Sequence, residues 1–178
     1  GTITKTLHGK SEVEFYEEYI RAIKNIPTKP RITFEVNARP REEVQRYKNA
    51  GADHIHFNME VWDKTLFPWI NPGKAERVGW DNWVRWMEDA VEVFGNGMVQ
   101  PSFVSGVEMA RPHGFKTVDE AVKSTTSGFE YLMSRGILPR PQQWRREPST
   151  ALCKEAEQPP VPLDYYVLMT RTWYELYQ

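Results

Sequence analysis

The stretch GADHIHFNMEVWD, residues 51–63, carries the clearest strand pattern in the chain. Successive side chains of a strand point to opposite faces, so His54, His56, Asn58 and Glu60 share one face. The apolar residues between them occupy the other face, and the pattern ends after Glu60 in a run with Trp and Pro. This stretch predicts a strand with one packing face and one polar face that opens into a loop.

Outward from this strand, the sequence alternates predicted helices with predicted strands. Ser11 with Glu14 and Thr117 with Glu120 have the spacing of capping boxes, which start helices. Apolar residues at helical spacing and Gly stops predict helices over 11–26, 40–50, 80–94, 117–135 and 163–177. Alternation or extended composition predicts further strands over 31–37, 98–106 and 137–144. Residues 61–79 are too irregular for a regular element, 1–9 show no pattern, and 145–162 form a Pro-rich surface excursion.

Alternating strands and helices with short turns predict a parallel sheet covered by helices. Four to five strands are too few for a closed eight-stranded barrel. The predicted fold class is therefore α/β, a partial (β/α) TIM-type barrel of about four to five parallel strands over residues 1–144. Residues 145–178 are expected to add the excursion and an amphipathic helix packed on the same domain. Such folds bind ligands at the C-terminal rim of their strands.

The predicted strands keep one polar face, unlike strands that are buried on both sides. Burying hydrogen-bonding groups without partners costs roughly 1 to 3 kcal/mol each. The polar face of the strands is therefore expected to contact water or to hold a polar ligand. An exposed antiparallel sheet is the alternative. The candidate cavity residues are Glu35, Asn37, His54, His56, Gln100 and Ser102.

Composition limits the class of protein. The 178 residues carry 23 basic and 24 acidic side chains, a net charge of −1, which argues against nucleic-acid binding by bulk charge. Without an apolar run near 18 residues or a signal-peptide pattern, we expect a cytoplasmic protein that does not enter a membrane. The single cysteine, Cys153, excludes an internal disulfide and a cluster held by several thiolates of this chain.

Two motifs resemble a known family. Residues 57–60, FNME, followed by residues 102–108, SFVSGVE, are similar to the later half of a biotin-synthase-like radical S-adenosylmethionine (radical SAM) barrel. The similarity covers about residues 33–144. It implies that Asn58 and Glu60 meet the ribose hydroxyls of S-adenosylmethionine. It also implies that backbone groups from Val104 to Gly106 meet the adenine, that Glu108 shapes that turn, and that Arg77, or alternatively Lys74, meets the methionyl carboxylate.

The sequence departs from this family at the iron–sulfur cluster. It has no Cys-x3-Cys-x2-Cys loop, so we expect an N-terminal portion or a separate subunit to hold the [4Fe–4S] cluster. The abrupt start at Gly1 favours a C-terminal piece of a longer enzyme, which alone performs no reductive cofactor cleavage. In the complete enzyme the resemblance implies a 5′-deoxyadenosyl radical that takes a hydrogen from an unidentified substrate. The chain's share is to bind the cofactor and shape the cavity, with no catalytic residue assigned.

Two other functions stay open. His54 and His56, with Glu60 and with Glu35 or His113 as a further ligand, have a spacing seen in metal-dependent barrel hydrolases, although no metal is expected in the favoured interpretation. A non-catalytic half-barrel that binds a nucleotide or a partner is the second alternative, with some of the seven tryptophans as interface anchors. The basic run 140–146 around Trp144 suits either an anionic ligand or a solvated loop.

Overall fold

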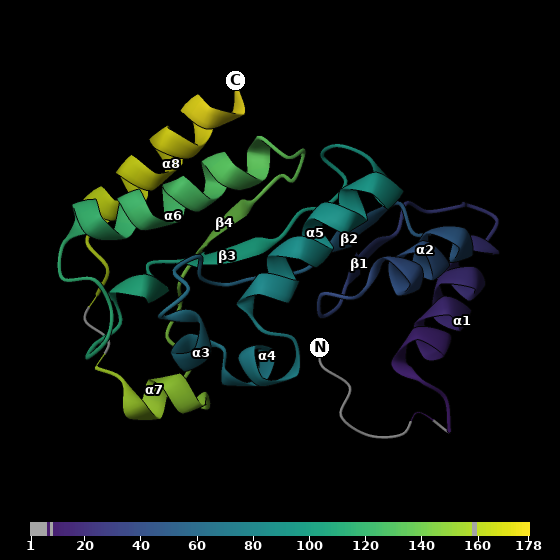
Figure 1. Cartoon of the computed structure of the whole chain (residues 1–178), viewed down its shortest axis with the longest axis horizontal. Helices are drawn as coiled ribbons and strands as arrows, with labels where there is room; N and C mark the ends of the chain where they lie inside the picture. The colour runs from purple at the N-terminus through teal and green to yellow at the C-terminus, as the bar shows by residue number, and fades with distance from the viewer. Residues whose placement is uncertain (1–6, 8, 158–159) are drawn as a thin grey trace.

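The structure, a computed structural model, describes residues 7, 9–157 and 160–178. Most of segment 1–9, for which the sequence predicts no regular element, lies outside them. Helices and strands alternate along the described chain (Figure 1). The elements are α1 Glu12–Lys24, β1 Thr33–Glu35, α2 Arg41–Ala50, β2 His54–His56, α3 Phe67–Ile70, α4 Pro72–Arg77, α5 Trp80–Phe94, β3 Ser102–Ser105, η1 Val107–Met109, α6 Val118–Met133, β4 Arg140–Gln143, α7 Ala151–Glu155 and α8 Leu163–Tyr177.

The four strands are parallel, which confirms the α/β class and excludes the antiparallel alternative for these segments. β1 pairs with β2, and β3 pairs with β4. Parallel bridges from Ile55 to Val99, from Glu60 to Phe103 and from Val99 to Ile137 join the two pairs into one row. The described strands do not close into a barrel.

The predicted helices form where their local signals place them. Glu14 N donates to Ser11 Oγ at 3.2 Å and Glu120 N to Thr117 Oγ1 at 3.3 Å, so both capping boxes exist. α2 ends at Gly51, whose φ of 114° lies in a region that favours glycine. α5 and α8 have the predicted bounds.

The helices cover the apolar face of the strands. Phe34, Ile55, Phe57, Val99 and Phe103 on that face are buried. Figure 1 shows α1, α2, α5, α6 and α8 succeeding one another along the strands, and contacts join α1 to α2, α2 to α5, and α6 to α8. The opposite face is open at β1, where both polar residues are exposed. The division of the chain at residue 144 stays a prediction.

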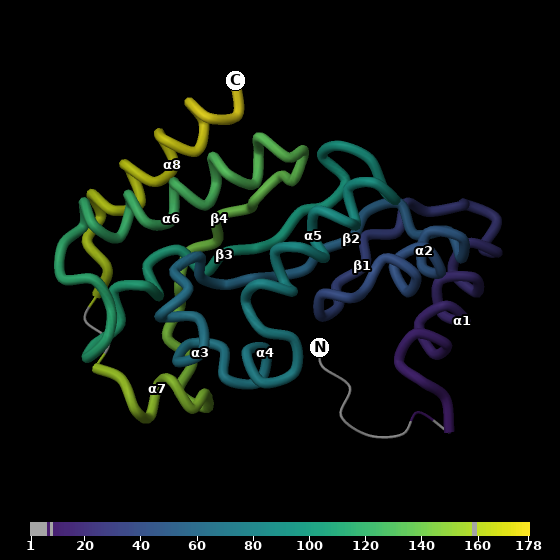
Figure 2. The backbone as a smooth tube through the Cα atoms, viewed as in Figure 1, coloured from purple at the N-terminus to yellow at the C-terminus, as the bar shows by residue number. Residues whose placement is uncertain are grey.

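Two predicted loops contain short helices, so the expectation of no regular element over 61–79 was wrong. Asp63 Oδ1 accepts from the backbone of Thr65 and Leu66 at 2.9 Å each, which starts the turn before α3. Pro72 begins α4, and Thr150 caps α7 inside the predicted excursion. These helices are too short for helical periodicity to reveal them. Figure 2 shows α3, α4 and α7 on one side of the strands, away from the C-terminal end of α8.

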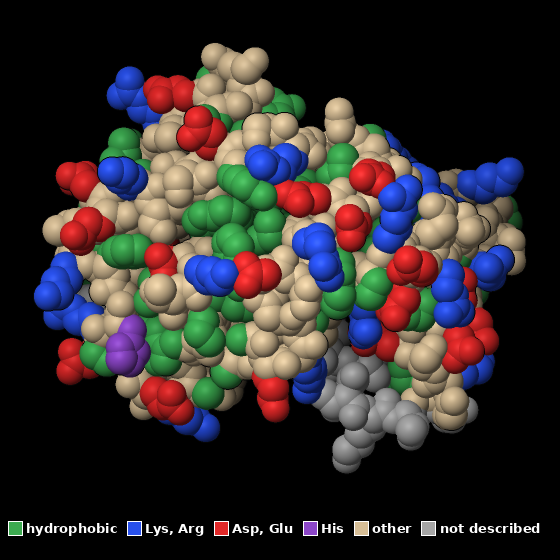
Figure 3. All heavy atoms as spheres, viewed as in Figure 1, with side chains coloured by type: hydrophobic (Ala, Val, Ile, Leu, Met, Phe, Trp, Pro, Cys, Tyr) green, Lys and Arg blue, Asp and Glu red, His purple; other side chains and the backbone are tan. Residues whose placement is uncertain are grey.

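The surface mixes charges of both signs. Figure 3 shows Lys and Arg interspersed with Asp and Glu, most densely over the side where α1 and α2 lie. There Arg39 pairs with Glu12, and Arg46 pairs with Glu17. No described helix combines the length and the apolar character needed to cross a membrane.

Candidate functional site

Glu60 lies where the polar row of the central strand ends. Its φ of 67° is left-handed, a strained conformation for a residue with a Cβ that is often kept at functional sites. Val104 N donates to Glu60 O at 2.8 Å and Glu60 N to Ser102 O at 3.1 Å, which fixes it against β3. Lys74 Nζ of α4 donates to Glu60 Oε1 and to the backbone oxygen of Asn58, both at 2.6 Å. Glu60 is therefore held by two elements, its backbone by β3 and its carboxylate by α4.

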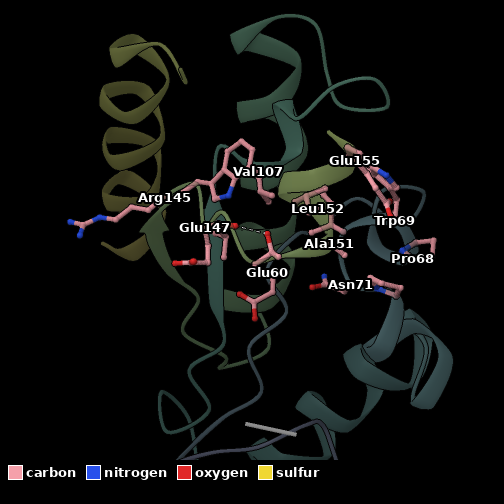
Figure 4. Close-up of a pocket in the computed structure, with 15 residues that line it drawn as sticks. Glu60, Pro68, Trp69, Asn71, Val107, Arg145, Glu147, Ala151, Leu152 and Glu155 are labelled. Carbon is pink, nitrogen blue, oxygen red and sulfur yellow. Dashed lines mark hydrogen bonds between the residues drawn. The ribbon is translucent and has the colours of Figure 1, made fainter. Parts of the chain in front are cut away.

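A cleft of about 550 Å³ opens beside Glu60, at the carboxyl ends of β2, β3 and β4. α3 supplies one wall and α7 another, and in Figure 4 Glu60 lies between Glu147 and Asn71, below Ala151 and Leu152. Apolar side chains form most of the wall, among them Trp69, Ile70, Val104, Val107, Trp144 and Leu152, while Glu60, Asn71, Arg145, Glu147 and Glu155 supply polar groups. An apolar cleft with a few polar groups is typical of small-molecule sites.

Asn58 links the strands below this cleft. Its Oδ1 accepts from Ser102 N at 3.1 Å, and Gln142 Nε2 donates to Ser102 Oγ at 3.1 Å. These bonds connect β2, β3 and β4 through side chains. The described lining of the cleft does not include Asn58, and its side chain contacts the neighbouring strand β3.

Glu108, predicted to shape the turn after β3, is buried with its relative exposure at 2%. Gly106 N donates to Glu108 Oε2 at 2.8 Å, and the hydroxyls of Thr125 and Tyr165 donate to Oε1. Burial raises the pKa of the Glu108 carboxyl, and the three donors oppose that rise. Burial and the nearby Glu108 also raise the pKa of the Tyr165 phenol. Gly106 and Glu108 thus belong to a buried network that joins the turn to α6 and α8.

His56 lies on the polar face of β2 but is only 2% exposed. Its Nδ1 is 3.4 Å from Glu35 Oε1, and neither ring nitrogen has a hydrogen bond of acceptable geometry among the described residues. Burial lowers the pKa of His56, Arg140 lowers it further, and Glu35 opposes the change. Burial and Arg140 therefore disfavour the protonated ring, while its contacts with Glu35 and Gln100 favour it.

The other predicted cavity residues do not all face the same cleft. His54 and Gln100 line a separate cavity of about 420 Å³ with Met98 and Ile137, at the opposite end of the strands. Gln100 Nε2 donates to Gly97 O at 2.8 Å. Asn37 is half-buried just beyond β1. None of the six predicted cavity residues lines the cleft beside Glu60, so the single cavity expected from the sequence does not coincide with that cleft.

Comparison with known proteins gives two matches. The chain is 25% identical over 137 residues to bacteriochlorophyllide c C-7(1)-hydroxylase of Chlorobaculum limnaeum, which covers 76% of this chain and 30% of that protein. The structure matches methylornithine synthase with a TM-score of 0.67 and 13% identity, over 92% of this chain and 43% of the other. No family model matches. The two matches support a radical SAM relationship.

Both matches support the resemblance to the later part of a biotin-synthase-like radical SAM barrel that the two motifs suggested. The solved structure contributes the fold alone, because its sequence identity is low. The chain spans less than half the length of the two proteins it matches. The activity of a complete protein is therefore a matter of proposal.

Other site predictions can now be placed on the radical SAM-like fold. Arg77 is exposed near the end of α4, outside the described lining of the cleft, whereas Lys74 of the same helix reaches Glu60. In the described part of the chain no three His, Cys, Asp or Glu side chains gather closely enough to hold a metal ion. His113 packs its ring against Trp69. The His54/His56 hydrolase therefore gains no support.

Sequence reasoning missed the cleft residues of α3 and α7. Trp69, Leu152 and Glu155 come from segments that were expected to be irregular. The available signal was the length of the two loops that follow β2 and β4, because long loops at strand ends carry function in barrels. Their convergence depends on strand order, which the loop sequences do not contain.

Proposed function

We propose that the chain binds S-adenosylmethionine in the cleft after β2, as the C-terminal part of a radical SAM enzyme. The observation that carries this proposal is Glu60, whose backbone is strained and whose carboxylate lies beside an apolar wall at the C-terminal rim of parallel strands. Nucleosides combine a flat ring with hydroxyl donors, and this cleft offers an apolar surface and an acceptor. The family resemblance supplies the identity of the nucleoside.

The residues present fit this ligand. Lys74 occupies Glu60 Oε1, whereas Oε2 accepts no hydrogen bond from the described residues and is available to ribose hydroxyls. Val104 and Val107 provide an apolar surface for the adenine, while Asn58 and Glu108 hold the surrounding strands and turn in place. Lys74 contacts Glu60, whereas Arg77 lies outside the cleft lining, so Lys74 is the candidate cation for the methionyl carboxylate.

The residues do not fit a [4Fe–4S] cluster. Cys153 is the only cysteine, and its buried sulfur accepts from Arg146 Nε at 3.0 Å. The cluster therefore belongs to another portion or subunit. When S-adenosylmethionine is bound in the complete enzyme it supplies radical chemistry, and this chain's residues orient it and exclude water. Glu35, Asn37, His56 and Ser102 are candidate substrate contacts, and a cytoplasmic location stays a prediction.

Calorimetric titration of the complete protein with S-adenosylmethionine tests the proposal. We expect Glu60→Ala to weaken binding about tenfold to a hundredfold, because the carboxylate accepts charge-assisted hydrogen bonds. Asn58→Ala should weaken it less, since Asn58 contacts Ser102. Glu76→Gln, an exposed change on α4, is the matched control and should bind like the wild type.

Wild-type affinity in both Glu60→Ala and Asn58→Ala would refute the site. Binding without any cofactor cleavage in the complete, cluster-loaded protein would favour the non-catalytic half-barrel. Absence of binding by the wild type would reject the proposed function itself.

A further inference from the structure

The outer face of α8 carries a row of apolar side chains that no described part of the chain covers. Four large side chains of the row have relative exposures from 55% to 74%, namely Leu163, Val167, Tyr174 and Tyr177. The opposite face of the helix is buried through Tyr165 and Met169, and α8 packs on α6. In Figure 1 α8 lies at the edge of the molecule, beyond α6. A contiguous exposed apolar row of this kind is typical of an interaction surface.

The spacing of this row is that of a coiled-coil seam. Its exposed positions recur at intervals of four, three and four residues, at Leu163, Val167, Thr170 and Tyr174, which together are called the outer seam. Alternating intervals of three and four residues keep a row facing one partner helix, because they match the 3.5-residue period of coiled coils. The buried face already joins α8 to its own domain, so the outer seam has the pattern for a second helix.

The charges beside the outer seam match those of a second, antiparallel copy of α8. Asp164 and Arg171 are seven residues apart, so both flank the same side of the seam. When Val167 packs against Thr170 of the second copy, Asp164 of each helix lies beside Arg171 of the other, and the two-fold symmetry makes this pair twice. Arg171 contacts Glu175 of its own helix at 2.9 Å, but both side chains are more than half exposed, so that pair is weak. Arg171 can therefore turn to the Asp164 carboxylate of the second copy.

Other arrangements of the two helices lose this charge match. Sliding the antiparallel pair by one heptad brings Arg171 beside Arg171 of the second copy, and like charges oppose association. A parallel pair separates Asp164 from Arg171 and buries Thr170 against its own copy. The antiparallel arrangement instead packs the threonine against Val167 and Leu163 against Tyr174. Charge and apolar packing thus favour the same orientation and register.

We propose that the outer seam of α8 joins two copies of the complete protein through an antiparallel helix pair. The 15 residues of α8 span about 22 Å at 1.5 Å per residue, which gives four layers of seam contacts. An interface of this size is small, so the dimer dissociates on dilution. The inference goes beyond the proposed function and does not depend on it, because α8 contributes no residue to the described lining of the cleft beside Glu60.

Sedimentation equilibrium of the complete protein over a dilution series tests the proposal. We expect the wild type to pass from dimer to monomer as it is diluted. Val167→Glu should weaken the association at least tenfold, because it places a charge in the centre of the seam. Asp164→Arg should weaken it too, since it sets two arginines side by side. Adding Arg171→Asp to Asp164→Arg should restore the association, because the pair re-forms with its signs exchanged.

The matched control is Glu42→Arg on α2. Glu42, like Asp164, is an exposed acid in the first turn of its helix, so the two substitutions make the same charge change against the same helix dipole. α2 lies on the other side of the molecule from α8 in Figure 1. Glu42→Arg should associate like the wild type.

A wild type that stays monomeric at every concentration would overturn the inference and would mean that another portion of the protein, or another partner, covers the outer seam. A dimer that survives Val167→Glu would place the interface elsewhere and overturn it as well. If the double charge exchange associates no better than Asp164→Arg, the antiparallel pair is rejected. The substituted side chains are exposed, so urea denaturation of the diluted monomers should give the wild-type midpoint, which separates lost association from lost folding.

Discussion

Two glutamates that follow the ends of neighbouring strands have opposite environments. Glu60, after β2, lies at an open cleft, has a strained backbone and is paired with one lysine. Glu108, after β3, is buried and accepts three hydrogen bonds from the turn, α6 and α8. The first carboxylate is therefore open to a ligand, as we propose, whereas the second holds the architecture around it.

The largest expected effect is on stability, at Glu108. Replacing it with Ala leaves the buried donors of Gly106, Thr125 and Tyr165 without an acceptor. We expect Glu108→Ala to lower the free energy of unfolding by about 3 kcal/mol or more, as measured by urea denaturation. A loss below about 1 kcal/mol would mean that the two glutamates do not differ in role.

The turn that Glu108 holds can also be disrupted by a substitution at Gly106, whose backbone conformation favours glycine. Gly106 has a φ of 102°, and a Cβ there would lie 2.7 Å from Val161 Cγ2. We expect Gly106→Ala to destabilise the protein by about 2 kcal/mol, from strain and crowding together. Gly97→Ala is the control, since Gly97 has a φ of 74° but nothing within 4 Å of the added atom. If both variants lose the same stability, packing against Val161 is unimportant.

The pH dependence of stability sharpens the comparison. The pKa of Glu108 is raised above its usual value of 4.5 by burial. The unfolded chain therefore releases this proton first as pH rises. The group's contribution is complete below about pH 4.5 and is lost as pH rises towards the folded-state pKa, by at most about 1.4 kcal/mol per pH unit.

Urea denaturation of the wild type and Glu108→Gln across pH 4 to 8 measures this. As pH rises, the unfolding free energy of the wild type should fall relative to that of Glu108→Gln. If this difference in unfolding free energy does not change with pH, or if the wild type becomes relatively more stable as pH rises, the raised pKa is contradicted.

The smallest expected effect on stability is at Glu60. Glu60→Gly relieves the backbone strain but loses an ion pair whose members are 21% and 25% exposed, so we expect a net change within about 1 kcal/mol. Glu60→Ala loses the pair and keeps the strain, so it should be less stable than Glu60→Gly in the same urea assay. The opposite order would mean that the left-handed backbone stores no strain.

Local patterns predicted much of the fold. The two capping boxes, the stop at Gly51 and the alternation around Ile55 are interactions between residues close in sequence, so they can be recognised without coordinates. Four parallel strands and five long helices followed from them. The short helices α3, α4 and α7 did not, because a few residues contain no period and depend on caps and packing.

The site was less predictable. The sequence placed six residues in one cofactor site, namely Asn58, Glu60, Arg77, Val104, Gly106 and Glu108, and of these Glu60 and Val104 line the cleft. None of the predicted cavity residues lines this cleft, and His54 and Gln100 line a cavity at the other end of the strands. Faces of a strand can be assigned by alternation, but depth along the strand and closure by other segments cannot.

By itself the sequence determined where strands and helices form and which strand faces are polar, since these depend on residues a few positions apart. Only the tertiary structure decided which carboxylate faces an open cleft and which is buried. Lys74, Thr125 and Tyr165 are separated from their glutamate partners by 14, 17 and 57 residues. Burial and hydrogen bonding, which set the chemistry of an acid, come from these distant partners and exist only once the chain has folded.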